Sequence, residues 1–185
     1  MRPCQDLATV DSPRAREQLW SDLRGFFEDD EGYGAGGTVW FLDIEPVDVK
    51  HLWDHVSARA SSFGDDPTIY FDGDTPSDPP ALFEAVERLL AGEGVSGVSP
   101  RLKGVRSHGE LLPDLFPEVY SDAFGIYWWF GHPEDDWNPA TASALAELLG
   151  ELRAFVPGAR LELEHSDDPD KLWQPISAYL SSVRP

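Results

Sequence analysis

The stretch Phe124-Gly-Ile-Tyr-Trp-Trp-Phe130 decides how the rest of the chain is interpreted. Aromatic and β-branched residues fill it, which is typical of a strand. Successive side chains of a strand point to opposite sides, and here both sides are apolar. We therefore expect a central strand that is covered on both faces of its sheet. Trp128 and Trp129 are predicted to be buried on opposite faces.

The segments on either side of this strand alternate between helical and extended patterns. Helical spacing of apolar residues begins at Ser12, Asp48, Ser77, Asn138 and Asp168. Extended patterns cover Thr38–Ile44, Thr68–Asp72, Val95–Val98 and Arg160–His165, whereas Leu111–Tyr120 holds two prolines and is expected to be irregular. Strands separated by helices favour a sheet covered by helices on both faces.

The predicted fold is therefore α/β. We expect a single domain over residues 1–185, with a mixed sheet of four to five strands and helices on both faces. The alternative is an α+β fold with an antiparallel sheet. A Gly/Ser-rich segment around 92–109 is expected to be flexible.

The charge of the chain is strongly negative. Among 185 residues, 34 are acidic and 14 are basic, which gives 14 − 34 = −20. Nucleic acids and anionic membranes are polyanions, so the charge argues against both as partners. Only three basic residues are lysine, and a salt-adapted cytoplasm would also select such a composition.

The sequence also limits the cellular compartment that we expect and the kinds of disulfide or metal site that the chain can form. The single cysteine, Cys4, provides neither an internal disulfide framework nor a cysteine-built zinc site. The chain contains no apolar run of about 18 residues and no apolar leader, so we expect a cytoplasmic protein.

Acidic residues gather where the predicted strands end. The clusters are Asp43 with Glu45; Asp72 with Asp74; His132 with Glu134, Asp135 and Asp136; and His165 with Asp167 and Asp168. If the strands are parallel, all four clusters lie at one edge of the sheet, where α/β folds place ligand sites. Alternatively, many of these carboxylates cap the helices that follow.

One pair of histidines has a spacing that suits a metal. His51 and His55 are four residues apart on one helix face, and Asp48 lies on the same side one turn earlier. No further ligand is evident, so this trio is the alternative to ordinary surface side chains. We expect no tightly bound zinc and no cofactor.

Trp137 differs from the other six tryptophans because it follows three acids in a polar loop. It is either a hydrophobic staple at the entry of the next helix or an exposed anchor for a partner. We expect His132, Glu134, Asp135, Asp136 and Trp137 to form part of a surface for a basic protein, together with Asp72 and Asp74.

These features favour a binding protein over an enzyme. The leading hypothesis is an acidic protein that binds and inhibits a basic protein partner, as toxin-immunity proteins and nuclease inhibitors do. The first alternative is a metal-dependent hydrolase that uses carboxylates at the strand ends with His132 and His165. The second is a structural or regulatory domain of a salt-adapted cell.

Overall fold

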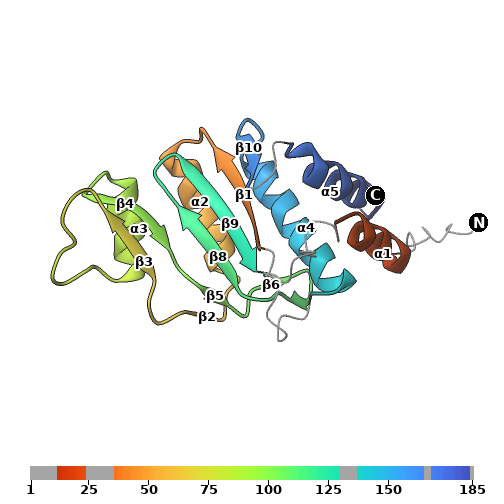
Figure 1. Ribbon diagram of the computed structural model, residues 1–185, viewed down its shortest axis with the longest axis horizontal. Helices are drawn as coiled ribbons and strands as arrows, with labels where there is room; N and C mark the ends of the chain where they lie inside the picture. Colours follow the sequence, from red (N-terminus) through yellow and green to blue (C-terminus); the bar gives the residue numbers. More distant parts are fainter. Residues whose placement is uncertain (1–11, 24–35, 130–136, 165–167, 184–185) are drawn as a thin grey trace, which may run out of the picture.

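The computed structural model describes residues 12–23, 36–129, 137–164 and 168–183. These residues form five helices and ten strands (Figure 1). The helices are α1 (Ser12–Leu23), α2 (Pro46–Ser57), α3 (Leu82–Leu90), α4 (Pro139–Phe155) and α5 (Asp170–Val183). The strands are β1 (Gly36–Leu42), β2 (Ser62–Phe63), β3 (Thr68–Phe71), β4 (Val95–Ser99), β5 (Leu102–Lys103), β6 (Arg106–Ser107), β7 (Glu110–Leu111), β8 (Leu115–Val119), β9 (Ala123–Trp129) and β10 (Arg160–Leu163).

The strand predicted from residues 124–130 is β9, and it pairs along its whole length with β1. The register places Gly37 opposite Trp128 and Gly125 opposite Trp40. A Cβ atom on Gly37 would lie 2.9 Å from Cζ2 of Trp128, and one on Gly125 would lie 2.9 Å from Cε3 of Trp40. Each tryptophan therefore lies over the glycine of the opposite strand, on the two different faces of the sheet.

The main sheet runs in the order β10-β1-β9-β8-β4-β3, with β2 and β5 attached beside β8. The predicted α/β class and single domain are confirmed, and β9 is an inner strand. All described pairs are antiparallel, so the pairing is that of the alternative arrangement.

The sheet has eight strands, which is three more than the five extended segments expected from the sequence. Two of them, β2 and β5, have only two residues each and carry little sequence signal. The third is β8, where irregular structure was expected because of Pro117. On its side facing away from β9, β8 is paired only at Leu115 and Val119, so the missing N–H of Pro117 falls in a gap of the ladder.

The segment around 92–109, which we expected to be flexible, contains β4, β5 and β6. Its flexibility and the domain boundaries stay predictions.

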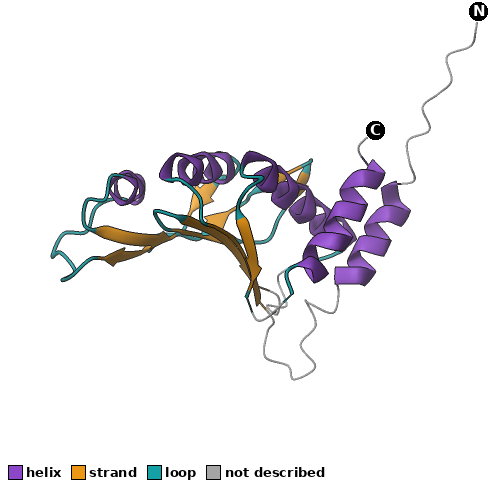
Figure 2. Ribbon diagram, turned by 90° about the horizontal axis from the view of Figure 1, so that it is seen from above, coloured by secondary structure: helices purple, strands orange, loops and turns teal. Residues whose placement is uncertain are grey.

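The described helices cover one face of the sheet instead of both. Figure 2 shows α2, α3 and α4 above the sheet, with α1 and α5 packed beside α4 at one end. Phe41, Phe124, Ile126 and Trp128 fill the space beneath the helices, and each is at most 1% exposed. The prediction for Trp128 is confirmed, whereas the side chain of Trp129 lies outside the described residues.

No described helix combines the length and the apolarity needed to cross a bilayer.

The strand directions correct the expectation that four acidic clusters share one edge. Because neighbouring strands are antiparallel, β1 and β3 end at one edge of the sheet, and β9 and β10 end at the opposite edge. Asp43 and Asp72 share an edge but stand four strand spacings apart, roughly 19 Å. The clusters after β1 and β3 therefore do not converge on one pocket, while most residues of the other two clusters lie outside the described part of the chain.

We predict that Trp128→Ala lowers the free energy of unfolding by about 3–5 kcal/mol, because a fully buried indole leaves a cavity over Gly37. Urea denaturation measures the change. Leu111→Ala is the control, since Leu111 is 53% exposed and should cost less than about 1 kcal/mol. Equal losses in the two variants would contradict the buried position of Trp128.

Candidate functional site

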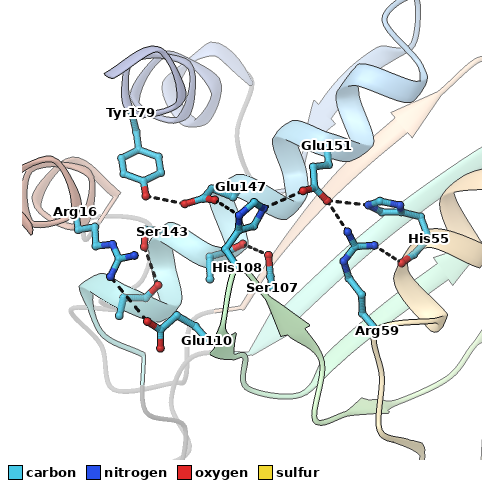
Figure 3. A network of polar contacts seen from close by, with 12 residues as sticks. Arg16, His55, Arg59, Ser107, His108, Glu110, Ser143, Glu147, Glu151 and Tyr179 are labelled. Atoms are coloured by element: carbon cyan, nitrogen blue, oxygen red, sulfur yellow. Dashed lines mark hydrogen bonds and ion pairs between the residues drawn. The ribbon is translucent and has the colours of Figure 1, made fainter. Parts of the chain in front are cut away.

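A network of polar side chains is centred on two glutamates one turn apart on α4 (Figure 3). Glu151 accepts hydrogen bonds from Nε2 of His55 and from the guanidinium of Arg59, both at 2.8 Å. Its other oxygen lies 2.8 Å from Nε2 of His108, and Glu147 lies 2.6 Å from Nδ1 of the same ring. The ring of His108 thus lies between the two glutamates, with one ring nitrogen facing each carboxylate.

The hairpin β6–β7 brings His108 to α4. His108 and Gly109 form its two-residue turn with φ of 48° and 88°, and positive φ at both positions is the pattern of a type I′ turn. The buried hydroxyl of Ser107 donates to the carbonyl of Ala144 at 2.8 Å and fixes the hairpin on the helix. From α5, the hydroxyl of Tyr179 donates to Glu147 at 2.8 Å.

The surroundings of Glu151 favour its ionised form. Burial alone would raise the pKa of Glu151, but hydrogen bonds from His55 and His108 and the charge of Arg59 outweigh it and hold the pKa below its ordinary value. The two carboxylates face the guanidinium of Arg59 and the rings of His55 and His108, so each already has partners within the protein. We therefore assign this network to holding α2, α4, α5 and the hairpin together.

This network also accounts for one of the three candidate metal ligands on α2. His55 bonds Glu151 and lies edge-on against Phe155, with ring centroids 4.8 Å apart. His51 is exposed, and Asp48 is half-buried in the first turn of the helix. Within the described parts of the chain, no group of three or more His, Cys, Asp or Glu side chains is placed to hold a metal.

At the end of the molecule formed by β3, β4 and α3 (Figure 1), acidic side chains outnumber basic ones. Between positions 65 and 93 the chain has eight acidic residues and one basic residue, Arg88. The acidic end consists of exposed carboxylates in this segment: Asp65, Asp66, Asp72, Asp74, Asp78, Glu84 and Glu93. None of them has an ion pair with another described residue, whereas the eighth, Glu87, pairs with Lys50 at 3.2 Å.

A pocket of about 650 Å³ opens within the acidic end. Ile69, Phe71 and Leu82 line it together with Phe63 and Phe83. The rings of Phe63 and Phe83 meet at 5.2 Å in an edge-on contact, yet Phe83 remains 53% exposed. Asp65 and Asp66 line the same pocket, so an apolar floor lies beside unpaired carboxylates.

Only some of the predicted partner-binding residues belong to the described part of the chain. Asp72 and Asp74 are exposed directly after β3, and Thr75 from the same loop lines the pocket. His132, Glu134, Asp135 and Asp136 lie outside the described residues.

Trp137 is half-buried against the core, immediately before Asn138. Asn138 caps α4, because its side chain accepts from the N–H groups of Ala140 and Thr141. This position favours the staple interpretation for Trp137, and its role in binding stays a prediction.

Sequence reasoning missed Glu147 and Glu151. The apolar stripe of α4 was evident, but nothing in the sequence marks which carboxylates of a helix lie beside a distant histidine. Two side chains of the basic run from Arg101 to His108 face carboxylates. Arg101 bonds Asp114 at 2.6 Å, and His108 bonds the two glutamates.

Comparisons with known proteins assign no family to this chain. No family model matches the sequence, and no curated protein is significantly similar to it. One similar solved structure is described as the toxic C-terminal tip of CdiA from Pseudomonas aeruginosa in complex with immune protein. The similarity has a TM-score of 0.46 at 12% identity and covers 74% of this chain and 90% of that chain. At this level it says nothing about the partner of this chain.

We predict that Glu151→Gln destabilises the protein by about 1–3 kcal/mol at pH 7, because it removes the charge that two histidines and Arg59 face. The pKa of Glu151 is lowered in the folded state, so its contribution is present above the unfolded-state value of about 4.5. That contribution disappears as the pH falls through the folded-state pKa. The difference between wild type and variant should therefore shrink below pH 4.5.

Urea unfolding at pH 7 and at several lower pH values measures this difference. Glu84→Gln, on an exposed side chain without an ion pair, is the control and should change little at any pH. A difference for Glu151→Gln that stays constant with pH would contradict the role of its ionised form.

Proposed function

We propose that this protein binds a basic protein through the acidic end and inhibits it. The observation that carries the proposal is the set of seven exposed carboxylates without ion pairs to described residues, next to an apolar pocket. In folded proteins, carboxylates at this density repel one another, so a cationic partner gains by neutralising them. The charge of −20 over the whole chain adds a long-range attraction for the same partner.

The pocket supplies what charge alone lacks. Exposed charges mainly speed the encounter of two proteins, whereas affinity comes from side chains buried at the centre of the interface. The exposed ring of Phe83 and the apolar pocket wall offer such a centre, and the aspartates around them form its polar rim. This combination fits a partner whose surface has an apolar side chain surrounded by lysines or arginines.

We infer inhibition from the kind of partner that has a basic surface. Nucleases and many toxins that act on nucleic acids bind a polyanion, so the surfaces they use are basic. An acidic protein that covers such a surface excludes the nucleic acid. The proposed class is therefore that of toxin-immunity proteins and nuclease inhibitors, acting in the cytoplasm. The loop from His132 to Trp137 is proposed as a second contact of the same partner.

The test begins with capture of proteins from the source cells on the tagged full chain, followed by purification of the captured protein. We predict that Asp66→Asn/Asp72→Asn/Asp74→Asn slows association by about tenfold and weakens its salt dependence, as loss of steering charge does. Glu17→Gln/Asp122→Asn/Asp170→Asn is the control, because it removes the same charge from exposed positions elsewhere. It should change the association rate by less than about threefold. Surface plasmon resonance at two salt concentrations measures the rates.

One further variant and a co-expression experiment complete the test. Glu134→Gln/Asp135→Asn/Asp136→Asn examines the second contact in the same way. Co-expression of the partner with wild-type protein examines inhibition and should relieve any toxicity or nuclease activity of the partner. An acidic partner, or equal rates for the first variant and its control, would overturn the proposal.

A further inference from the structure

The face of the sheet that no described helix covers is rich in aromatic side chains. We call it the aromatic face: Trp40, Tyr70, Phe116, Tyr120 and Tyr127. An antiparallel sheet with one free face normally presents polar side chains to water there. Tyr70 is exposed and the other four are half-buried, and apolar surface that stays accessible to water can mark an interaction site.

Three of the five rings contact one another in a row, and Phe116 and Tyr127 form a separate pair with centroids 5.7 Å apart. Tyr120 lies 5.9 Å from Trp40 and 6.4 Å from Tyr70 between ring centroids, and the second pair is stacked at 20°. Glycines beneath the rings allow them to lie against the sheet. A Cβ on Gly97 would lie 2.6 Å from Tyr120, and one on Gly125 would lie 2.9 Å from Trp40.

One carboxylate stands among these rings. Glu118 is half-buried on β8, directly opposite Gly125, and Gly125 is the residue over which Trp40 lies. Tyr120, two residues further along the same face, has its hydroxyl 3.5 Å from Glu118. No cation among the described residues pairs with Glu118. Burial raises the pKa of Glu118, and the charge of Glu164 raises it further.

The rim of the aromatic face already holds an arginine. The guanidinium carbon of Arg101 lies over the ring of Phe116, 5.8 Å from its centroid, while its nitrogens bond Asp114. A ring below and a carboxylate beside the guanidinium are the two contacts that this cation prefers. Trp40, Tyr120 and Glu118 offer the same two contacts without an arginine of the described chain to occupy them.

We propose that the aromatic face binds an arginine side chain of a basic protein, with the guanidinium stacked on Trp40 and Tyr120 and paired with Glu118. Arginine fits better than lysine, because the planar guanidinium stacks on rings and a compact ammonium does not. The inference rests on the proposed function in that the arginine belongs to the basic partner. The site differs from the acidic end, so the two are tested separately.

The probe is a blocked peptide of sequence Gly-Arg-Gly-Arg-Gly, compared with matched peptides that have lysine or the neutral isostere citrulline. Titration into isotopically labelled full chain at about 150 mM salt limits long-range attraction to the negative surface. The expected result is a shift of the Trp40 indole N–H signal, assigned with Trp40→Phe, and of the Tyr120 and Glu118 signals. The lysine peptide should bind more weakly, and the citrulline peptide should give no shift.

We predict that Glu118→Gln weakens binding of the arginine peptide at least about fivefold, because the nearly isosteric amide keeps the shape and removes the charge. Trp40→Leu should weaken it by a similar factor, with thermal melting used to confirm the fold of both variants. Asp66→Asn/Asp72→Asn/Asp74→Asn should leave the Trp40 shift unchanged.

Equal binding of the citrulline peptide, unchanged binding to Glu118→Gln, or shifts confined to the acidic end would overturn the inference. None of these results depends on capture of the partner, so the proposed function can stand if the arginine site fails. Conversely, failure to find a basic partner leaves the peptide measurement intact.

Discussion

The reciprocal contact between two tryptophans and two glycines on β1 and β9 is the constraint on which the structure depends. A side chain larger than hydrogen at Gly37 or Gly125 would meet an indole ring at 2.9 Å. A shift of one residue in the register would place each ring over a side chain and turn every residue of the strand to the wrong face. The contact on one face anchors the helices over Trp128, and the contact on the other creates the aromatic face around Trp40.

The local patterns predicted most of the secondary structure, because each has a local physical cause. Alternation along residues 124–129 predicted an inner strand, and Asn138-Pro139 predicted the start of α4 that the capping hydrogen bonds confirm. Strand direction has no local signal, since apolar alternation is the same for parallel and antiparallel pairs. The apolar character of both faces of β9 suggested helices on both sides, whereas on the second face Trp40 covers the strand at Gly125.

The residues of the candidate sites also divide into those that local sequence predicts and those that it does not. Exposed Asp72 and Asp74 could be predicted, because acids beside Gly and Pro after a strand belong to a surface turn. Glu118 and Glu151 could not, because their surroundings come from segments up to 96 residues away, as in the bond between His55 and Glu151. With 14 basic residues for 34 acidic ones, only some of the carboxylates can pair with a basic side chain. Arg59, His55 and His108 face the two glutamates of α4, while the acidic end has no such partners among the described residues.

The aspartates on either side of β3 also affect self-association, because β3 lies at the border of the described sheet. A four-residue strand at the border of the described sheet leaves one side of its backbone without a neighbour, and such borders invite two copies of a protein to join. Asp65 and Asp66 precede this strand, and Asp72 and Asp74 follow it. Two copies brought border to border would place eight aspartates close together, so mutual repulsion keeps the molecules apart in a crowded solution. Against a surface of opposite sign the same four side chains attract, so they oppose self-association while favouring a basic partner.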